Sequence, residues 1–269
     1  MITFVTCWYE LQSKYNKNLY EKWIENFLLN IKVCNLVIFT NKYSLNTVEK
    51  YTKNRGNIKI ILRELEEFHN YKYKEDWIRN HKLNHELNTK TCWEVNMLWN
   101  EKTHFVEYVH KNNIFTSEWY GWCDVGYFRG RSCDLDVNKI RDWPSASKIN
   151  SLDRTKIHYG NVNGNMQRTF QIYKQIMLKG ENGLPSVPIP SGEIFIAAGF
   201  FLVFKNKISW WNNIHDTTLK KYFDNYYLVK DDQMIVLNNI VDNIRQVQLH
   251  VEFTNGLHDN WFMFQRLLL

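Results

Sequence analysis

The stretch that decides the fold is ITFVTCWY at residues 2–9, NLYEKWIENFLLNIK at 18–32 and LVIFTN at 36–41. The first and third segments are short apolar runs, which are typical of strands buried in a parallel sheet. The middle segment places apolar side chains on one face at helical spacing, namely Leu19, Trp23, Phe27 and Ile31. The sequence therefore predicts a strand, a helix and a second strand in that order.

The same alternation continues along the next part of the chain. Ser44 can cap a helix over SLNTVEKYTKN at 44–54, because its hydroxyl can accept a hydrogen bond from an exposed amide of the first turn. The apolar run IKIILREL at 58–65 predicts a third strand. Residues 66–90 are charged and rich in His, Asn and Lys, and we expect a loop with some helix there.

A further helix and strand follow the polar segment. The stretch at 91–112 predicts one helix with Thr91 as its cap. It leads directly into WYGWCDVG at 119–126, which has the composition of a strand. Repeated alternation of strands and helices indicates an α/β fold, with a mostly parallel, Rossmann-like sheet covered by helices on both faces.

The pattern weakens after Arg131, and we expect a mixed carboxy-terminal part. Three of the four prolines lie in LPSVPIPSG at 184–192. The run IFIAAGFFLVF at 194–204 predicts either two consecutive strands or one strand bent at Gly199. The remaining pattern predicts a helix at about 207–223, a helix that begins near Asp231 and a final strand at 245–253.

Composition limits the class of protein. A chain of 269 residues with 44% hydrophobic and 16% aromatic residues can bury a sizeable core as a single domain. The formal charge of +6 is scattered along the chain, which favours a phosphorylated small ligand over a nucleic acid. Five cysteines without a CxxC pair indicate a reducing compartment. We therefore expect a cytoplasmic protein without a transmembrane segment, and loose contact with a membrane surface is left open.

Asp124 is the first candidate site residue. It follows the apolar strand in WYGWCDVGYFR at 119–129, and ligands of parallel sheets bind outside the carboxyl ends of the strands. A carboxylate there can hold Mg²⁺ or Mn²⁺, which would bridge two phosphates of a ligand. The alternative is a turn aspartate that accepts a hydrogen bond from the backbone after it, and this alternative is favoured if the tripeptide is considered alone.

Two segments in the second half are further candidates. Gly199, after Ala197 and Ala198, would let the backbone approach a bound sugar closely, although small residues equally allow tight packing in a sheet. Asp231, Asp232 and Gln233 stand at a predicted helix start, where one carboxylate is sufficient as a cap. The second carboxylate could bind a sugar hydroxyl or act as a base.

His258 is the last candidate and lies in FTNGLHDNW at 253–261, after the final predicted strand. An isolated histidine in a loop is more often exposed or structural than a ligand. A neutral imidazole is nevertheless a suitable second protein ligand for an ion held by Asp124. We therefore keep both interpretations of His258 open at this point.

These pieces in this order resemble the nucleotide-diphospho-sugar transferases of the GT-A fold and, more closely, the HtrL/YibB-like family. The resemblance covers nearly the whole chain, from the VTCWY strand through WCDVGYFR and AAGFF to the DDQ and LHDNW motifs. It implies a glycosyltransferase of the hexosyltransferase type, retaining or inverting, which moves a sugar from a nucleotide-diphosphate donor to a hydroxyl of a glycan or other acceptor. It also implies a nucleotide-binding half at 1–130 and an acceptor-side half at 131–269.

The resemblance also assigns roles to residues. It implies donor-binding residues, which are Thr6, Cys7, Trp8, Tyr9, Thr40, Asp124, Gly126 and Arg129. It implies acceptor-side residues, which are Ala198, Gly199 and Phe200, and catalytic residues, which are Asp232 and Gln233. Two other activities stay open, namely a metal-dependent nucleotide-sugar hydrolase and a non-catalytic nucleotide-binding or glycan-binding protein.

The implied cofactor is Mn²⁺ or Mg²⁺. Asp124 matches the first acid of the family's Asp-x-Asp motif, and His258 matches a carboxy-terminal histidine that completes the metal shell. Gly126 stands where the second acid would be, which puts the usual two-carboxylate arrangement in doubt. Arg129 is close enough in sequence to compensate, as a charge-assisted donor to a phosphate.

Overall fold

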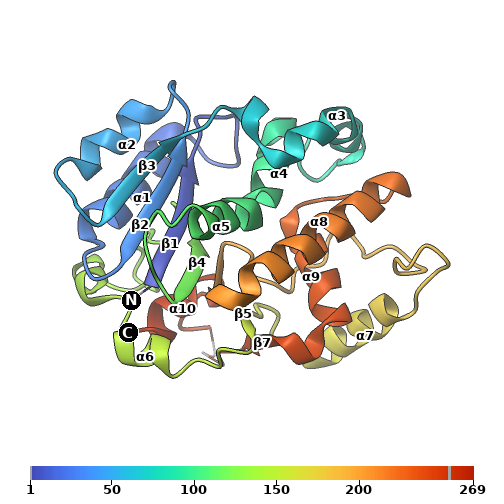
Figure 1. The fold of residues 1–269 in the computed structure, drawn as a ribbon. Coiled ribbons are helices and arrows are strands. Elements are labelled where there is room, and N and C mark those ends of the chain that lie inside the picture. The colour runs from blue at the N-terminus through green and yellow to red at the C-terminus, as the bar shows by residue number, and fades with distance from the viewer. Residues whose placement is uncertain (1, 254–255) are drawn as a thin grey trace.

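The computed structural model describes residues 2–253 and 256–269, and its centre is a seven-stranded sheet of order β3-β2-β1-β4-β6-β5-β7 (Figure 1). The strands are β1 (Ile2–Trp8), β2 (Asn35–Thr40), β3 (Ile58–Leu62), β4 (Trp119–Cys123), β5 (Ile157–Gly160), β6 (Phe200–Phe204) and β7 (Val247–His250). β1 pairs in parallel with β2 and β4, β2 with β3, and β5 with β7. Only β6 runs against its neighbours, β4 and β5. The predicted parallel sheet with a mixed carboxy-terminal part is therefore confirmed.

Helices surround this sheet. They are α1 (Lys17–Asn30), α2 (Leu45–Thr52), α3 (Lys74–Leu83), α4 (Trp93–Asn100), α5 (Lys102–Lys111), α6 (Ala146–Asn150), α7 (Met166–Met177), α8 (Ile208–Asp224), α9 (Asp232–Asp242) and α10 (Phe264–Leu267). Short 3₁₀ helices lie at Leu65–Glu67, His69–Tyr73, Val137–Asp142, Lys205–Lys207, Ile244–Gln246 and Asn260–Phe262. The predicted helices at 18–32, 44–54, 207–223 and from Asp231 are confirmed, as is some helix within 66–90.

The predicted helix at 91–112 is instead two helices, α4 and α5, which meet at Glu101. Cys92, and not Thr91, is the residue before α4, and its side chain makes no capping bond. The Glu101 amide donates to the Leu98 carbonyl three residues earlier, which tightens the turn. The buried Glu101 carboxylate accepts the backbone amides of His69 and Asn70 at 2.8 and 3.1 Å. This contact holds the junction of α4 and α5 against the polar segment.

Other differences lie in the second half of the chain. The run at 194–204 forms one strand, β6, which begins only after Gly199, while Ile196 makes an isolated bridge to Asn161. Two elements, β5 and α7, are not predicted by the sequence pattern. Because β5 has only four residues, it gives no apolar run long enough to recognise.

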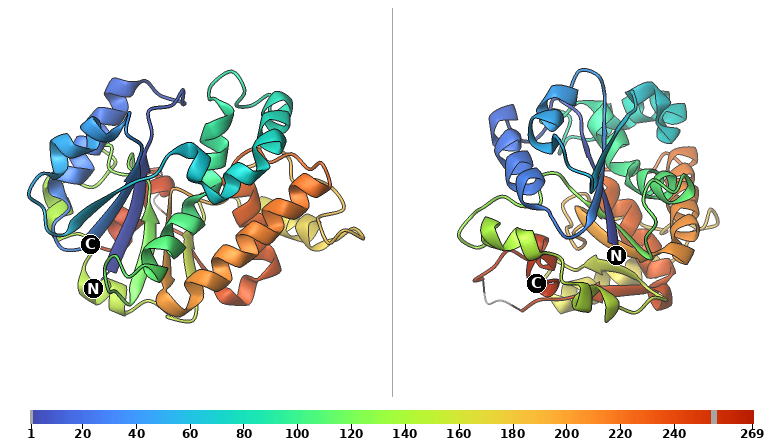
Figure 2. Two further views of the ribbon diagram at one scale, coloured as in Figure 1. Left: turned by 45° about the horizontal axis from the view of Figure 1, so that its top comes forward. Right: turned by 60° about the vertical axis from the view of Figure 1, so that its left-hand side comes forward.

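Two layers of helices cover the two faces of the sheet (Figures 1 and 2). Successive β1 residues point to opposite faces, so that Phe4 joins one hydrophobic cluster and Val5 the other. The cluster around Phe4 receives side chains from α1, α2, α6 and α10, and the cluster around Val5 receives them from α4, α5, α7, α8 and α9. Helices on both faces are thus confirmed.

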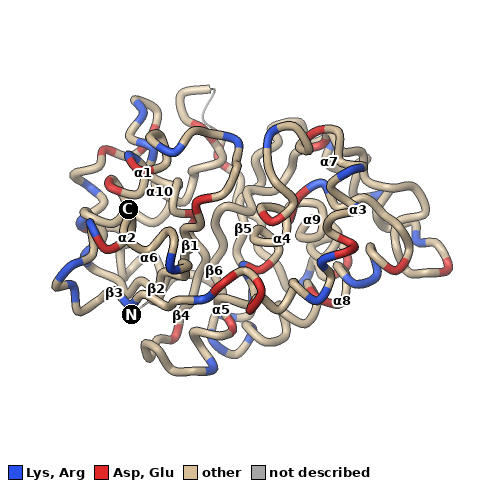
Figure 3. The backbone as a smooth tube through the Cα atoms, turned by 90° about the horizontal axis from the view of Figure 1, so that it is seen from above, with Lys and Arg blue, Asp and Glu red and all other residues tan. Residues whose placement is uncertain are grey.

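Charged residues of both signs are distributed along the described part of the chain. Figure 3 shows Lys and Arg interspersed with Asp and Glu over nearly all elements. Among the described residues, no helix combines the length and apolar character needed to cross a bilayer. All five cysteines are free thiols.

Candidate functional site

A cavity of about 520 Å³ opens at the carboxyl ends of β1 and β4. It is lined by Cys7, Trp8 and Tyr9 at the end of β1, and by Asp124 to Tyr127 after β4. The chain runs from β1 outward to β2 and β3, and β4 then returns to the other side of β1. In open α/β sheets such a reversal of strand order leaves a crevice that binds ligands. The volume suits a small molecule of the size of a nucleotide.

The cavity brings together nine of the residues proposed from sequence, which are Cys7, Trp8, Tyr9, Asp124, Gly126, Arg129, Gly199, Asp232 and Gln233. Five others do not line it, namely Thr6, Thr40, Ala198, Phe200 and His258. Thr40 is buried, and its hydroxyl donates to the Trp8 carbonyl at 2.7 Å, so it supports the end of β1 from behind. The roles proposed for all these residues stay predictions.

Lys102 lies between two of the carboxylates and was not proposed from sequence. Its ammonium group is 2.8 Å from Asp232 Oδ2 and 3.3 Å from Asp124 Oδ1, and it donates to the Ala198 carbonyl at 3.0 Å. The side chains of Lys102 and Asp232 are 8% and 6% exposed, whereas that of Asp124 is 42% exposed. We call Lys102, Asp124 and Asp232 the cavity floor. Only Asp124 presents much of this floor to a ligand.

Burial and charge shift the titration of the floor. Burial raises the pKa of Asp232 to about 6, although the Lys102 ammonium acts in the opposite direction. Burial acts to lower the pKa of Lys102, but the Asp124 and Asp232 carboxylates overcome it and raise that pKa above its usual range. At neutral pH Lys102 is therefore an ammonium and Asp232 a carboxylate, and the two form an ion pair.

The backbone around Gly199 fixes Asp124. The Asp124 amide donates to the Gly199 carbonyl at 2.8 Å, and the Trp122 indole donates to Asp124 Oδ1 at 2.5 Å. A Cβ atom at Gly199 would lie only 2.8 Å from Asp124 Oδ2. A side chain at residue 199 would therefore force the Asp124 carboxylate to move from this position. The close contact with Asp124 is thus one reason for a glycine at this position, and its predicted approach to a bound sugar stays a prediction.

Three asparagines hold the segment that leads into α9. Asn80 and Asn96 donate to the Val229 carbonyl at 2.7 and 2.8 Å, and Asn84 donates to the Lys230 carbonyl at 2.8 Å. All three side chains are buried. Two of them come from the polar segment 66–90, so this segment contributes to the site by positioning Asp232.

Asp231 occupies the position of an N-cap, as expected. Its side chain nevertheless makes no capping hydrogen bond, and its Oδ1 atom is buried without a hydrogen-bond partner among the described residues. The nearest cation is Lys230 Nζ, 3.6 Å from Asp231 Oδ2. The interpretation of Asp231 as a capping side chain is therefore wrong.

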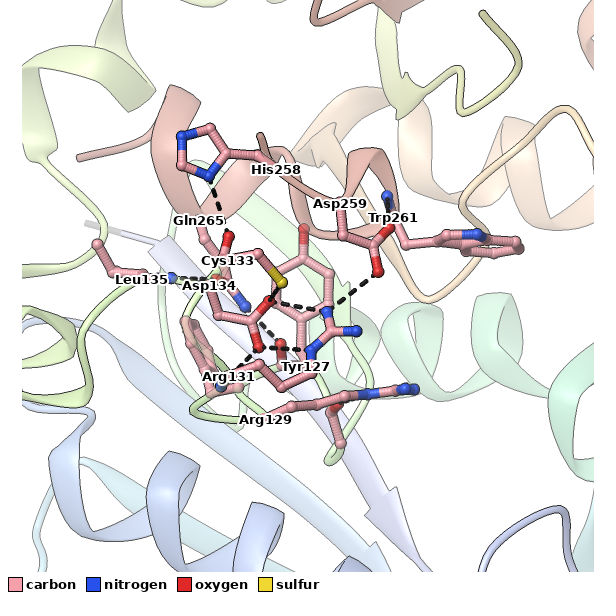
Figure 4. Close-up of polar contacts among 12 residues, drawn as sticks. Tyr127, Arg129, Arg131, Cys133, Asp134, Leu135, His258, Asp259, Trp261 and Gln265 are labelled. Atoms are coloured by element: carbon pink, nitrogen blue, oxygen red, sulfur yellow. Dashed lines mark hydrogen bonds and ion pairs between the residues drawn. The ribbon is translucent and has the colours of Figure 1, made fainter. Parts of the chain in front are cut away.

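Arg129 also lines the cavity and lies in the loop after β4 (Figure 4). Its guanidinium group stacks over Trp23 at 4.3 Å, Phe262 at 4.9 Å and Tyr15 at 5.3 Å. Its Nε donates to the Gly126 carbonyl at 3.3 Å. Among residues 2–253 and 256–269, no carboxylate lies within ion-pair distance of Arg129. Aromatic rings therefore hold its charge in place without neutralising it.

Arg131, in the same loop, has the opposite surroundings. Its guanidinium pairs with Asp134 at 2.8 Å and with Asp259 at 3.0 Å (Figure 4). The buried Gln265 side chain accepts from the Leu135 amide and donates to the Tyr127 carbonyl, so it pins both ends of the loop. We call Arg129, Arg131 and Asp259 the cavity rim.

His258 is next to Asp259 in sequence but is directed elsewhere. Its Nδ1 lies 3.1 Å from the Cys133 carbonyl, and in Figure 4 its ring and the Asp259 carboxylate leave the loop in opposite directions. Thr254 and Asn255 of the same predicted motif lie outside the described residues. Of the residues in this motif, Asp259 and Trp261 line the cavity, whereas His258 does not.

The ligands expected for a divalent cation are not assembled around Asp124. Asp124 Oδ1 is engaged by Trp122 and Lys102, and His258 does not line the cavity. Within the described part of the chain, three candidate ligand atoms converge only at His69, His104 and Asp216, a group that does not line the cavity. The residues present do not fit the metal site implied by the resemblance, and the predicted Mn²⁺ or Mg²⁺ stays untested.

Comparisons with known proteins give distant similarities only. No protein-family model matches the chain, and no curated protein does, so membership of the HtrL/YibB-like family stays a prediction. Mouse xyloside xylosyltransferase 1, in its apo form, is a similar solved structure with 11% identity and a TM-score of 0.47, over 93% of this chain and 84% of that chain. The galactosyltransferase LgtC, in complex with donor and acceptor sugar analogues, has 11% identity and a TM-score of 0.46, over 88% and 69%.

Proposed function

We propose that the chain is a glycosyltransferase that takes a sugar from a nucleotide-diphosphate donor and transfers it to a hydroxyl acceptor. The observation that carries the proposal is the cavity itself, where Arg129, without a carboxylate partner among the described residues, and the carboxylates of Asp124 and Asp232 line one space at the reversal of strand order. Such a site can hold a phosphorylated ligand and also place a carboxylate near its reacting carbon.

The diphosphate is proposed to bind near the rim. Arg129 faces the cavity without a carboxylate partner among the described residues, and a guanidinium can donate two parallel hydrogen bonds to a phosphate. Lys14 also lines the cavity, and its ammonium lies 4.7 Å from the centre of the Trp99 ring. The neighbouring rings of Tyr15 and Trp261 offer apolar faces for a base or a sugar.

Asp232 is proposed to act on the reacting groups, with Gln233 beside it. In the transfer, the bond between the anomeric carbon and the diphosphate oxygen breaks, the acceptor oxygen bonds to that carbon, and the acceptor proton passes to a base. A carboxylate that positions or deprotonates a hydroxyl must be ionised and must reach the ligand. Asp232 is ionised above pH 6 and lines the cavity. Both retaining and inverting outcomes are compatible with this arrangement.

The proposal is tested by calorimetry with nucleoside diphosphates and nucleotide sugars, followed by assays for transfer and for hydrolysis. We expect a uridine or guanosine diphosphate to bind, and turnover of the sugar donor to accelerate when a hydroxyl acceptor is added. Turnover that no acceptor accelerates would instead indicate a hydrolase. Binding without turnover would indicate a nucleotide-binding protein, and no binding would contradict the proposal. Each measurement is made with and without Mn²⁺, so that metal dependence is determined separately.

A further inference from the structure

The ammonium of Lys102 is surrounded as a bound cation would be. Its three protons can be directed to three oxygens, from Asp124, Asp232 and the Ala198 carbonyl, at 2.8 to 3.3 Å. Lys102 is buried and lines the cavity. The ammonium group thus lies between the two carboxylates and contacts one oxygen of each, and a divalent ion bound between Asp124 and Asp232 would meet this positive charge.

The position of the missing second acid is also occupied. A Cβ atom at Gly126 would lie 2.9 Å from the Cε3 atom of Trp23, so the ring fills the space that a carboxylate side chain would need. The Arg129 guanidinium also lies over that ring, 4.3 Å from its centre. Where an Asp-x-Asp motif would present a second negative charge, this chain presents an aromatic ring and a positive charge.

We propose that fixed cations of the protein replace the divalent ion, with Lys102 holding the two floor carboxylates and Arg129 neutralising the diphosphate. This inference rests on the proposed function of the cavity. Lys102 acts as a positioning residue, because its three protons are already directed to protein oxygens, and it keeps Asp124 and Asp232 beside each other despite their like charges. Arg129 is the cation that is left to contact the phosphates as the diphosphate departs.

The first experiment uses the wild-type chain. We measure the affinity for uridine and guanosine diphosphates by calorimetry, once in EDTA and once with excess Mn²⁺, and then titrate Mn²⁺ alone. We expect equal affinities in both buffers, transfer that persists in EDTA, and no heat from Mn²⁺ alone. An affinity that rises about tenfold or more with Mn²⁺, which is the scale of a metal-site contribution, overturns the inference and leaves the proposed function intact. Absence of nucleotide binding in both buffers contradicts the proposed function and the inference with it.

The second experiment removes the cation from the floor. Lys102→Met leaves two carboxylates facing each other without an ammonium, so this variant should acquire binding of Mn²⁺ alone, which the wild type lacks. The matched control is Lys111→Met on the same helix, where the lysine pairs with Glu107 at the surface and should leave metal binding and transfer unchanged. Melting temperatures show whether Lys102→Met is folded. If it is not, Lys102→Arg, which keeps the charge, should retain transfer in EDTA, and a requirement of that variant and of the wild type for Mn²⁺ would overturn the inference.

Discussion

The positively charged side chains in the floor and in the rim of the cavity have different surroundings. Lys102 in the floor is buried, and carboxylates or carbonyls meet all of its protons. Arg129 in the rim has no carboxylate partner among the described residues and is held by aromatic rings. A buried charge without a partner would destabilise the fold, whereas a partly exposed one can wait for an anionic ligand. This difference in surroundings is the reason why we propose an organising role for Lys102 and a ligand-binding role for Arg129.

Within the rim, Arg131 serves as a control for Arg129. Arg131 lies two residues from Arg129 in the same loop, but Asp134 and Asp259 already neutralise it. Two arginines in one loop are thus expected to have different functions, because within the described chain carboxylates neutralise Arg131 but not Arg129. Substitutions in the floor should change transfer most, substitutions of Arg129 should change affinity, and substitutions of residues that only pack should have the smallest effects.

The largest effect is expected for Asp124→Asn. The change keeps the volume of the side chain but removes the charge opposite Lys102, and loss of one preorganised electrostatic contact lowers turnover by about 10²–10³-fold. Steady-state kinetics and the melting temperature measure the two consequences. Asp242→Asn is a suitable control, because this aspartate pairs with Lys179 at the surface, 2.6 Å away. Turnover of Asp124→Asn near that of the control would remove Asp124 from the site.

A second effect concerns pH. Burial raises the pKa of Asp232 to about 6, so its carboxylate is ionised above that pH and protonated below it. Transfer should fall as the pH decreases through 6, while nucleotide affinity, assigned to the rim, should change little. Because the folded pKa lies above the unfolded value of 3.8, this group favours the folded state below pH 4 and that contribution is lost as the pH rises to 6. A transfer rate that stays constant from pH 7 to 5 would contradict the role of Asp232.

A third effect separates the two arginines. Arg129→Gln should weaken nucleoside-diphosphate binding by about 10–100-fold, the scale of a hydrogen bond to a charged group. Arg131→Gln should leave affinity nearly unchanged and should lower the melting temperature, because Asp134, whose side chain is fully buried, loses its partner. Calorimetry and thermal unfolding of both variants test this division. Equal losses of affinity would show that the two guanidinium groups contact the ligand together.

Local patterns in the sequence predicted much of the fold. Strands such as β1 and β2 are continuous apolar runs, and α1 has helical spacing, so each can be recognised from adjacent residues. The direction of β6 could not be predicted in this way, because it depends on pairing with β4, far away in sequence. Asp124 was found because it directly follows an apolar strand at the ligand-binding edge of a sheet.

Contacts between distant segments explain what the sequence did not reveal. Lys102 stands in a helix among other polar residues, and its Ala198 contact is 96 positions away. Asn80 and Asn84 reach the start of α9 across 149 and 146 positions. Nothing in the residues next to these side chains distinguishes them from exposed polar residues. The presence of Asp259 in the cavity could have been suspected, since it adjoins His258 in the same motif, but only the direction of each side chain separates the two.

The smallest effect on transfer and stability is expected for substitution of Asp231. Its neighbour in sequence, Asp232, is expected to show one of the largest effects. Asp231 occupies the N-cap position of α9, yet its side chain makes no capping bond, and its Oδ1 has no hydrogen-bond partner among the described residues. Asp231→Asn therefore loses no capping bond and weakens the 3.6 Å contact with Lys230 Nζ. It should change the free energy of unfolding by less than about 1 kcal/mol, the usual value of a cap.

Asp232→Asn makes the comparison sharp, because it removes the 2.8 Å ion pair with Lys102 one residue further along the chain. That variant should lose transfer while Asp231→Asn retains it, since of these two aspartates Asp232 is the one that pairs with the Lys102 ammonium. Thermal unfolding and turnover of both variants are measured together. Equal losses of transfer in Asp231→Asn and Asp232→Asn would show that both aspartates at the start of α9 contribute to transfer. The proposed difference between Asp232, which pairs with Lys102, and Asp231, which does not, would then be wrong.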